Sequence, residues 1–252
     1  MCDRRDLAVL FDGSFEGFLC VIYAYFYEKV VPLHIQTEDQ YQQTLDSEEY
    51  FVATDLDRAY KVQRAIRKKI SSNAERYLLR AYLNDEEDKF LDMFKYTVLG
   101  FKVGAAVDSH LQQDCVLRVH KLAMNVSREG HLLTGFCRFA ETTNGVYYCA
   151  ISPKNRVLPI LAEHFCDRLM NQAWVIHDKT HFQAAVYDGN KYIIADAPRD
   201  AIVELADTEE QIQDMWVAFF NKITIKERMN YKCQRTHLPL WFRKNMLEFK
   251  IN

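Results

Sequence analysis

The hydrophobic residues of this chain change their spacing near residue 130, and this change constrains the fold more than any other feature. Before it, apolar side chains recur every three or four residues in several segments, which is typical of helices. After it, short β-rich runs are separated by turn signals, Thr-Thr-Asn-Gly at 142–145 and Asp-Gly-Asn at 188–190. The pattern predicts an α+β fold.

The first half is expected to be rich in helix. Helical spacing predicts four helices, at residues 15–27, 58–80, 90–101 and 111–126. The first of these is apolar on nearly every side, so it should be central rather than half exposed. A short apolar run at 7–11 predicts a buried strand, and residues 34–36 predict another extended piece after a proline.

The second half is expected to form an antiparallel sheet, as a hairpin, a helix and a second hairpin, packed by helices. The predicted strands lie at 133–139, 146–151, 174–178, 182–187 and 192–195. An apolar stripe at 158–169 predicts the intervening helix, and a long helix is expected around 215–223. We predict one α+β unit over residues 1–252, with a helical region at 1–127 and the sheet with C-terminal helices at 128–252.

Composition limits the function classes. The chain has 252 residues and a formal net charge of −3, so charge over the whole molecule gives no signal for nucleic acid. No apolar run approaches the length needed to span a bilayer, and the charged start at residues 1–6 does not resemble a cleavable signal. We therefore expect a cytoplasmic protein that does not associate with a membrane.

The seven cysteines lie in apolar segments and form no Cys-x-x-Cys pair. This pattern predicts buried, reduced thiols and no zinc or iron–sulfur site. His177 and His181 are four residues apart, but they lie at a predicted strand end without an intervening Glu, so no metal site is expected there either. Asp12-Gly13-Ser14, at a predicted strand-to-helix junction, favours a tight turn over an anion site.

Local charge is uneven. Residues 38–57 contain seven acidic side chains and no Lys or Arg, whereas residues 58–80 contain eight basic side chains and one acidic one, Glu75. Arg64, Lys68 and Lys69 would lie on an exposed flank of the predicted helix. They are candidates for nucleic-acid binding, and the alternative is a solvated flank complementary to the acidic segment.

The end of the chain mixes cations with large aromatic residues. Lys and Arg attract phosphates, and an exposed Trp can stack on an unpaired base, at about 1–3 kcal/mol per base. The alternative is a helix docked by its aromatic face with solvated charges outside. The nucleic-acid-binding candidates here are Arg228, Arg235, Trp241, Arg243 and Lys244.

Residues 128–188 carry many titratable groups. We take four of them as candidate catalytic acids or bases: Glu129, His131, His164 and Asp178. Arg138 and Arg168 could join them to bind a phosphate or nucleobase. The alternative is a set of structural ion pairs, such as Arg168 with Asp178.

Several segments together resemble a bacterial family described only as a probable DNA metabolism protein. The matching segments are Phe-Asp-Gly-Ser-Phe-Glu-Gly at 11–17, Arg-Glu-Gly-His at 128–131, Gly-Phe-Cys-Arg-Phe at 135–139, His164-Phe165 with Arg168, Trp-Val-Ile-His-Asp at 174–178, Arg-Met-Asn at 228–230 and Leu-Pro-Leu-Trp-Phe at 238–242. The ending departs from the family's commoner aromatic pair, which begins with Tyr.

Members of that family lie beside a radical S-adenosylmethionine (radical SAM) protein proposed to modify or repair DNA, and in some proteins the domain is fused to a uracil-DNA glycosylase-like domain. The resemblance implies a binding or accessory protein in DNA metabolism or repair that works with a radical SAM partner. The cations and aromatic residues at the end of the chain would suit single-stranded or damaged DNA. The Fe-S cluster and S-adenosylmethionine are expected only in the partner, with no cofactor in this chain. The alternatives are an enzyme acting on a nucleobase or phosphodiester in DNA, and a structural protein–protein interaction module.

Overall fold

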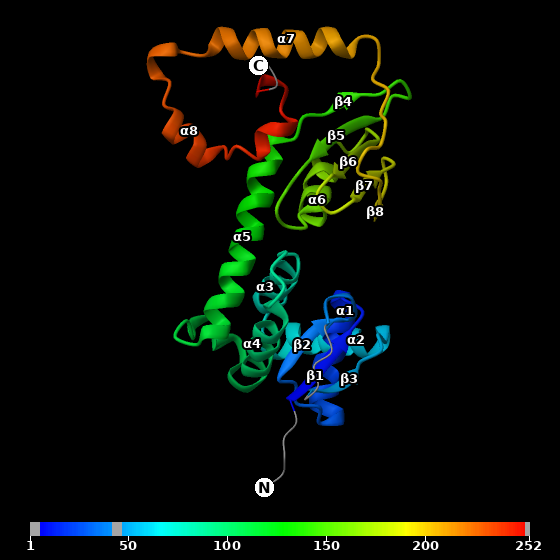
Figure 1. Cartoon of the computed structure of the whole chain (residues 1–252), viewed down its shortest axis with the longest axis vertical. Coiled ribbons are helices and arrows are strands. Elements are labelled where there is room, and N and C mark those ends of the chain that lie inside the picture. The colour runs from blue at the N-terminus through cyan, green and yellow to red at the C-terminus, as the bar shows by residue number, and fades with distance from the viewer. Residues whose placement is uncertain (1–5, 42–46, 250–252) are drawn as a thin grey trace. The chain divides into compact units, whose positions relative to one another are not determined.

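In the computed structural model, which describes residues 6–41 and 47–249, the chain divides into two compact units. We call Met1–Val126 the N-terminal unit and Ser127–Asn252 the C-terminal unit (Figure 1). Residues 1–5 of the charged start, and with them Cys2, lie outside the described residues. The fold class is α+β, as predicted.

The N-terminal unit is built around a three-stranded parallel sheet in the order β2-β1-β3. The elements of the unit are β1 (Asp6–Phe11), α1 (Phe15–Tyr23), the π-helical turn η1 (Ala24–Glu28), β2 (His34–Thr37), the 3-10 turn η2 (Glu38–Gln40), β3 (Ser47–Phe51), α2 (Leu56–Ala65), the π-helical turn η3 (Ile66–Ile70), α3 (Ser72–Tyr82), α4 (Lys89–Val103), the 3-10 turn η4 (Gly104–Ser109) and the start of α5 (Asp114–Phe136). β1 is central and apolar, and it buries Val9 and Phe11 completely. The strand β3 lies in the acidic segment, where none was expected.

The helix predicted at 58–80 is interrupted. Ser71 has an extended backbone and its hydroxyl accepts a hydrogen bond from the Ala74 N–H, so a new helix begins there. The basic block is therefore divided between α2, the π-helical turn η3 and α3. Helix α4 was predicted and is present, with Phe90, Met93 and Phe94 on its buried side.

The first predicted hairpin is wrong over residues 133–136, because helix α5 continues to Phe136. Buried side chains at Val126, Glu129 and Leu133 keep the helical spacing through this region. Gly130 does not end the helix. A Cβ atom there would lie 3.1 Å from Ile160, so the glycine permits close approach of a neighbouring helix.

The C-terminal unit contains a five-stranded sheet in the order β4-β5-β6-β7-β8. The strands are β4 (Ala140–Glu141), β5 (Tyr147–Ile151), β6 (Trp174–Asp178), β7 (Gln183–Tyr187) and β8 (Tyr192–Asp196). β5 and β6 are parallel, which corrects the expectation of a wholly antiparallel sheet. Helix α6 (Leu158–Arg168) makes the crossover between them and packs on the sheet (Figure 1), whereas β6, β7 and β8 form the predicted antiparallel hairpins.

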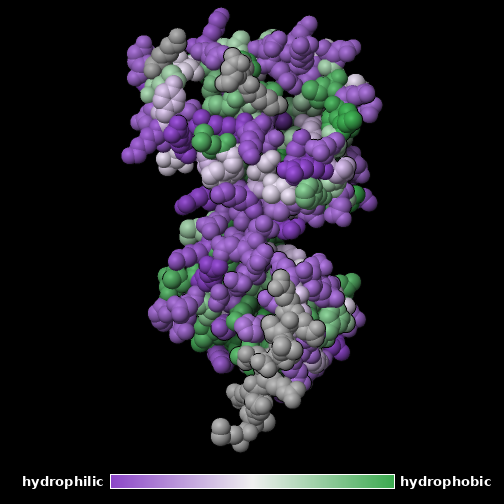
Figure 2. Space-filling view, viewed as in Figure 1, coloured by the Kyte–Doolittle hydropathy of each residue, from purple (hydrophilic) through white to green (hydrophobic). Residues whose placement is uncertain are grey.

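The rest of the C-terminal unit is helical. It consists of α7 (Glu209–Ile223), the 3-10 turn η5 (Lys226–Arg228), α8 (Tyr231–His237) and the 3-10 turns η6 (Phe242–Asn245) and η7 (Leu247–Phe249). No helix of the described part of the chain is long and apolar enough to cross a bilayer. Figure 2 shows a face on which hydrophilic residues predominate and hydrophobic residues form separate patches in each unit.

Candidate functional site

The predicted catalytic residue Glu129 is buried on α5, where it holds a loop. Its two carboxylate oxygens accept hydrogen bonds from the backbone N–H groups of Lys154 and Asn155, at 2.8 and 2.9 Å, and from the Asn155 side chain at 2.6 Å. These bonds satisfy a charge that would be costly to bury alone. Glu129 therefore fixes the chain between β5 and α6.

The other members of the predicted cluster do not gather around Glu129. His131 lies exposed on α5, and His164 and Arg168 lie exposed on α6. Within the described residues, no hydrogen bond or ion pair joins any two of the six residues proposed for this pocket. The arginine and aspartate that sequence reasoning considered as an ion pair, Arg168 and Asp178, have no such contact, since Asp178 pairs with His181.

Arg138 is engaged within the C-terminal unit. It lies just after α5, not on a strand, and its guanidinium pairs with the Glu248 carboxylate at 2.6 Å while lying over the Trp216 ring. The Glu248 side chain is only 2% exposed. Burial alone would raise the pKa of Glu248, but the hydrogen bonds from Arg138 hold that pKa below its ordinary value. This contact ties the end of the chain to the unit.

Asp178 ends the parallel strand β6 and forms a buried polar pair with His181. Its carboxylate accepts hydrogen bonds from the Thr180 and His181 backbone N–H groups and contacts the His181 ring Nδ1 at 2.6 Å. The preceding residue, His177, points to the opposite face of the sheet, where its Nδ1 lies 2.8 Å from the Tyr148 hydroxyl of β5. Sequence analysis chose Asp178 but missed Tyr148, because only the parallel pairing of the two strands brings it beside His177.

Tyr148 and His177 face a hollow of about 450 Å³, and Tyr148 also lines a neighbouring one of about 290 Å³ together with Arg138 and Lys179. Burial and the nearby Lys179 charge lower the pKa of His177. Burial raises the pKa of the Tyr148 hydroxyl. A neutral imidazole hydrogen-bonded to a protonated phenol can pass a proton, so the Tyr148–His177 pair is suited to acid–base chemistry.

Much of the basic and aromatic end of the chain packs within the C-terminal unit through its aromatic side chains, as in the alternative to nucleic-acid binding. Phe242 is buried, and Trp241 is half-buried beneath the Lys154 ammonium, 4.1 Å from its ring centre. Arg243 lies over Phe249 and donates to the Leu238 carbonyl. The three remaining candidates have exposed side chains: Arg228, Arg235 and Lys244.

Arg64, Lys68 and Lys69 are exposed on α2 and η3, as the flank prediction required. Arg67, between them in sequence, pairs with Glu75 at 2.6 Å. No carboxylate of a described residue forms an ion pair with Arg64, Lys68 or Lys69. The flank therefore presents cations that are not neutralised by these neighbours.

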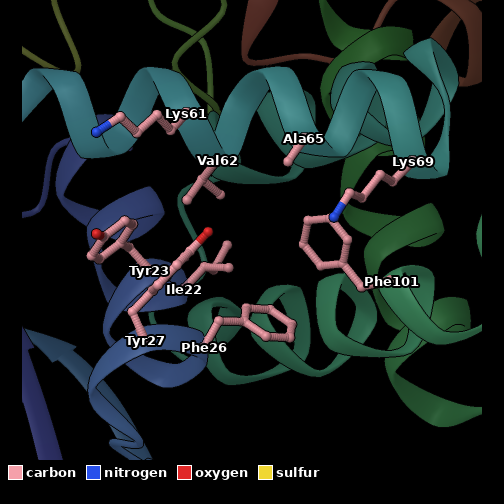
Figure 3. Close-up of a pocket in the computed structure, with 9 residues that line it drawn as sticks. All are labelled: Ile22, Tyr23, Phe26, Tyr27, Lys61, Val62, Ala65, Lys69 and Phe101. Atoms are coloured by element: carbon pink, nitrogen blue, oxygen red, sulfur yellow. The ribbon is translucent and has the colours of Figure 1, made fainter.

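Beside this flank lies a hollow of about 390 Å³, which we call the aryl pocket (Figure 3). It is lined by Ile22, Tyr23, Phe26, Tyr27, Lys61, Val62, Ala65, Lys69 and Phe101. Lys61 and Lys69 come from α2 and η3 at opposite ends of the hollow, and Lys69 extends towards Phe101. The sequence placed Lys69 on an exposed flank but did not predict the pocket, because its aromatic residues come from two distant helical segments.

Asp12 forms the tight turn that the sequence favoured. Its carboxylate accepts hydrogen bonds from the backbone and hydroxyl of Ser14 and from the Thr54 hydroxyl, while Gly13 takes a φ of +80°. Burial opposes ionisation here, but these hydrogen bonds hold the pKa of Asp12 below its ordinary value. The Ser14 hydroxyl accepts from the Gly17 N–H and caps α1.

The described cysteines are free thiols, and Cys20 and Cys149 are buried. Burial raises the pKa of Cys20, and contact with Cys149 together with burial raises that of Cys137. Among the residues that the structure describes, no group of three or more His, Cys, Asp or Glu side chains is arranged to hold a metal ion.

Comparison with known proteins gives a family but no activity. No curated protein matches the chain. Among solved structures, it is similar to a pGpG-specific phosphodiesterase, PggH, from Vibrio cholerae, with 8% identity and a TM-score of 0.36 over 86% of this chain and 100% of that chain. A likeness at this level supports no inference about fold or activity. Residues 87–248, more than half of the chain, match a domain of unknown function, DUF4130, and the chain belongs to that family.

Proposed function

We propose that this protein binds single-stranded or locally unpaired DNA through the cationic flank of its N-terminal unit. The observation that carries the proposal is the exposure of Arg64, Lys68 and Lys69 without a described carboxylate partner. Phosphate contacts from such side chains supply most of the sequence-independent affinity for nucleic acid. A slightly negative net charge does not prevent this, because all the acidic residues except Glu75 lie outside residues 58–80.

Two other arginines of the basic block, Arg58 and Arg67, are neutralised by carboxylates. Arg58 pairs with Glu28, and Arg67 pairs with Glu75. Arg64 instead lies over the Tyr60 ring, 5.9 Å from its centre, and keeps its charge exposed. An unneutralised cation beside an exposed aromatic side chain is the combination that single-stranded nucleic acid favours.

In DNA metabolism we propose an accessory role beside a radical SAM protein, as the family resemblance suggests. The exposed apolar side of α7 supports a protein partner, since Ile212, Met215 and Phe219 are each about half exposed or more and lie three to four residues apart. We expect Met215→Glu and Phe219→Glu to abolish co-purification of the radical SAM protein while the circular dichroism spectrum stays unchanged. Retained co-purification would remove α7 from that interface.

The DNA-binding proposal is tested by the salt dependence of affinity. For single strands the slope of log K against log salt is about −0.7 per neutralised phosphate. Replacing Arg64, Lys68 and Lys69 by alanine should therefore flatten the slope by about 2. A matched control replaces Lys95, Lys102 and Lys121, three exposed lysines of other helices of the same unit, and should leave the slope nearly unchanged. Equal slopes for both triple variants would reject the flank as the contact surface.

The hydrogen-bonded pair of Tyr148 and His177 favours a second candidate function, acid–base catalysis on a nucleobase in DNA. Two hollows adjoin this pair: Tyr148 lines both of them, and His177 lines one. Turnover of modified oligonucleotides, lost in Tyr148→Phe and His177→Gln, would establish it. Binding without turnover would leave the accessory role.

A further inference from the structure

We propose that the aryl pocket receives one unpaired nucleobase of the bound strand, with Lys61 and Lys69 contacting the flanking phosphates. This inference rests on the proposed DNA binding and deepens it, because it names the part of the strand that the N-terminal unit recognises. Its residues precede residue 87, apart from Phe101, so it adds a site mostly outside the matched domain.

The aromatic lining suits a flat ring. Tyr23 and Tyr27 are stacked with their centroids 4.3 Å apart, and Phe26 meets Phe101 edge to face at 5.2 Å. Tyr27 is 71% exposed, so it retains a surface that a base can cover. Base stacking on aromatic side chains is tolerant of sequence, since every base presents a π-face.

The charges of the pocket select an anion. Lys61 and Lys69 stand with Ala65 at a spacing of four residues and lie at opposite ends of the hollow (Figure 3). The lining contains two ammonium groups and no carboxylate. An apolar ligand would gain nothing from the two ammonium groups. A nucleotide within a strand, by contrast, places its base between two neighbouring phosphates that these groups can contact.

The local backbone sets these groups apart from ordinary core packing. Two π-helical turns, η1 and η3, border the pocket and supply Phe26, Tyr27 and Lys69. Such turns are rare, and where they are found they often mark functional sites. The volume of about 390 Å³ lies within the range of small-molecule sites.

The test compares an oligothymidylate with an abasic oligomer of the same length, by fluorescence anisotropy on the full chain. The abasic strand keeps the phosphates and lacks the bases. We expect the wild type to bind oligothymidylate about 5- to 100-fold more tightly than the abasic strand. Tyr27→Ala should remove this preference, and Tyr27→Phe should retain it. Phe51→Ala, which removes another exposed aromatic side chain of the same unit, is the control and should change nothing.

The outcomes separate the two proposals. If the wild type binds both strands equally and with the flank-dependent salt slope, the base pocket is rejected and DNA binding stands. If neither strand binds, the proposed function itself fails. Thymidine 5′-monophosphate should bind with the same Tyr27 dependence but more weakly, and equal affinity for it and the strand would reject the strand as ligand. If an oligoglutamate bound as tightly as the oligothymidylate and with the same dependence on Tyr27, a nucleotide would be rejected as the ligand of the pocket.

Discussion

Replacing Arg138 by alanine should destabilise the C-terminal unit by about 3 kcal/mol, because it leaves the Glu248 carboxylate buried without its counter-charge. The pair is made at 2.6 Å, with side-chain exposures of 22% for Arg138 and 2% for Glu248. Breaking a buried pair usually costs about 3–5 kcal/mol. We take the lower end because Arg138 is partly in water and the Trp216 indole N–H, at 3.3 Å, still donates to the carboxylate.

The assay is urea unfolding followed by tryptophan fluorescence, since Trp216 lies at the pair. Arg118→Ala is the control, because its pair with Glu86 is exposed on both sides and should contribute less than about 1 kcal/mol. Adding Glu248→Gln to Arg138→Ala should recover part of the loss, since the neutral amide needs no counter-charge. An Arg138→Ala cost below that of Arg118→Ala would refute the reasoning.

The pH dependence has a defined sign. The pKa of Glu248 is lowered in the folded state, so the stability that the pair contributes is present above the unfolded-state pKa and is lost as pH falls through the folded value. The difference between wild type and Arg138→Ala should therefore be full near neutral pH and shrink below a pH of about 4. A constant difference down to acidic pH would show that the carboxylate is not the group involved.

Two further predictions concern packing. Gly100→Ala should destabilise the protein by about 1–3 kcal/mol in thermal unfolding, because the new methyl group would lie 2.7 Å from Ile70, whereas Gly135→Ala has open space and should be neutral or slightly stabilising. An equal effect of both would contradict the close approach. Exposed Cys233 should react with iodoacetamide before buried Cys20, whose pKa is raised, and peptide mapping showing the reverse order would contradict the burial.

Strong local patterns predicted several elements correctly. The buried strand before Asp12, the central helix α1, the strands β6 to β8 and the long helix α7 all follow from spacing and turn signals. Sequence analysis failed where β-rich residues continued a helix, as in α5 up to Phe136. The buried spacing of Val126, Glu129 and Leu133 was the available signal, but the glycines at 130 and 135 masked it.

Strand pairing and the sites depended on tertiary structure. The succession of strand β5, helix α6 and strand β6 is the pattern of a parallel crossover. Because we interpreted these segments as parts of two hairpins, we did not predict the hydrogen bond between Tyr148 and His177. The exposed cations Arg64, Lys68 and Lys69 could be chosen from composition, since charge blocks lie at the surface. The sequence could not predict which cations are neutralised, because Arg67 and Arg138 form ion pairs with carboxylates that only the folded units bring near them.

The most direct test of the account is photo-crosslinking with an oligothymidylate that carries one 5-iodouracil, followed by mass spectrometry of the modified peptides. We predict attachment to Tyr23 or Tyr27 of the aryl pocket, lost when the unmodified strand is added in excess. Attachment confined to the C-terminal unit, or no attachment under conditions where the strand is bound, would contradict a base seated between α1, α2 and α4.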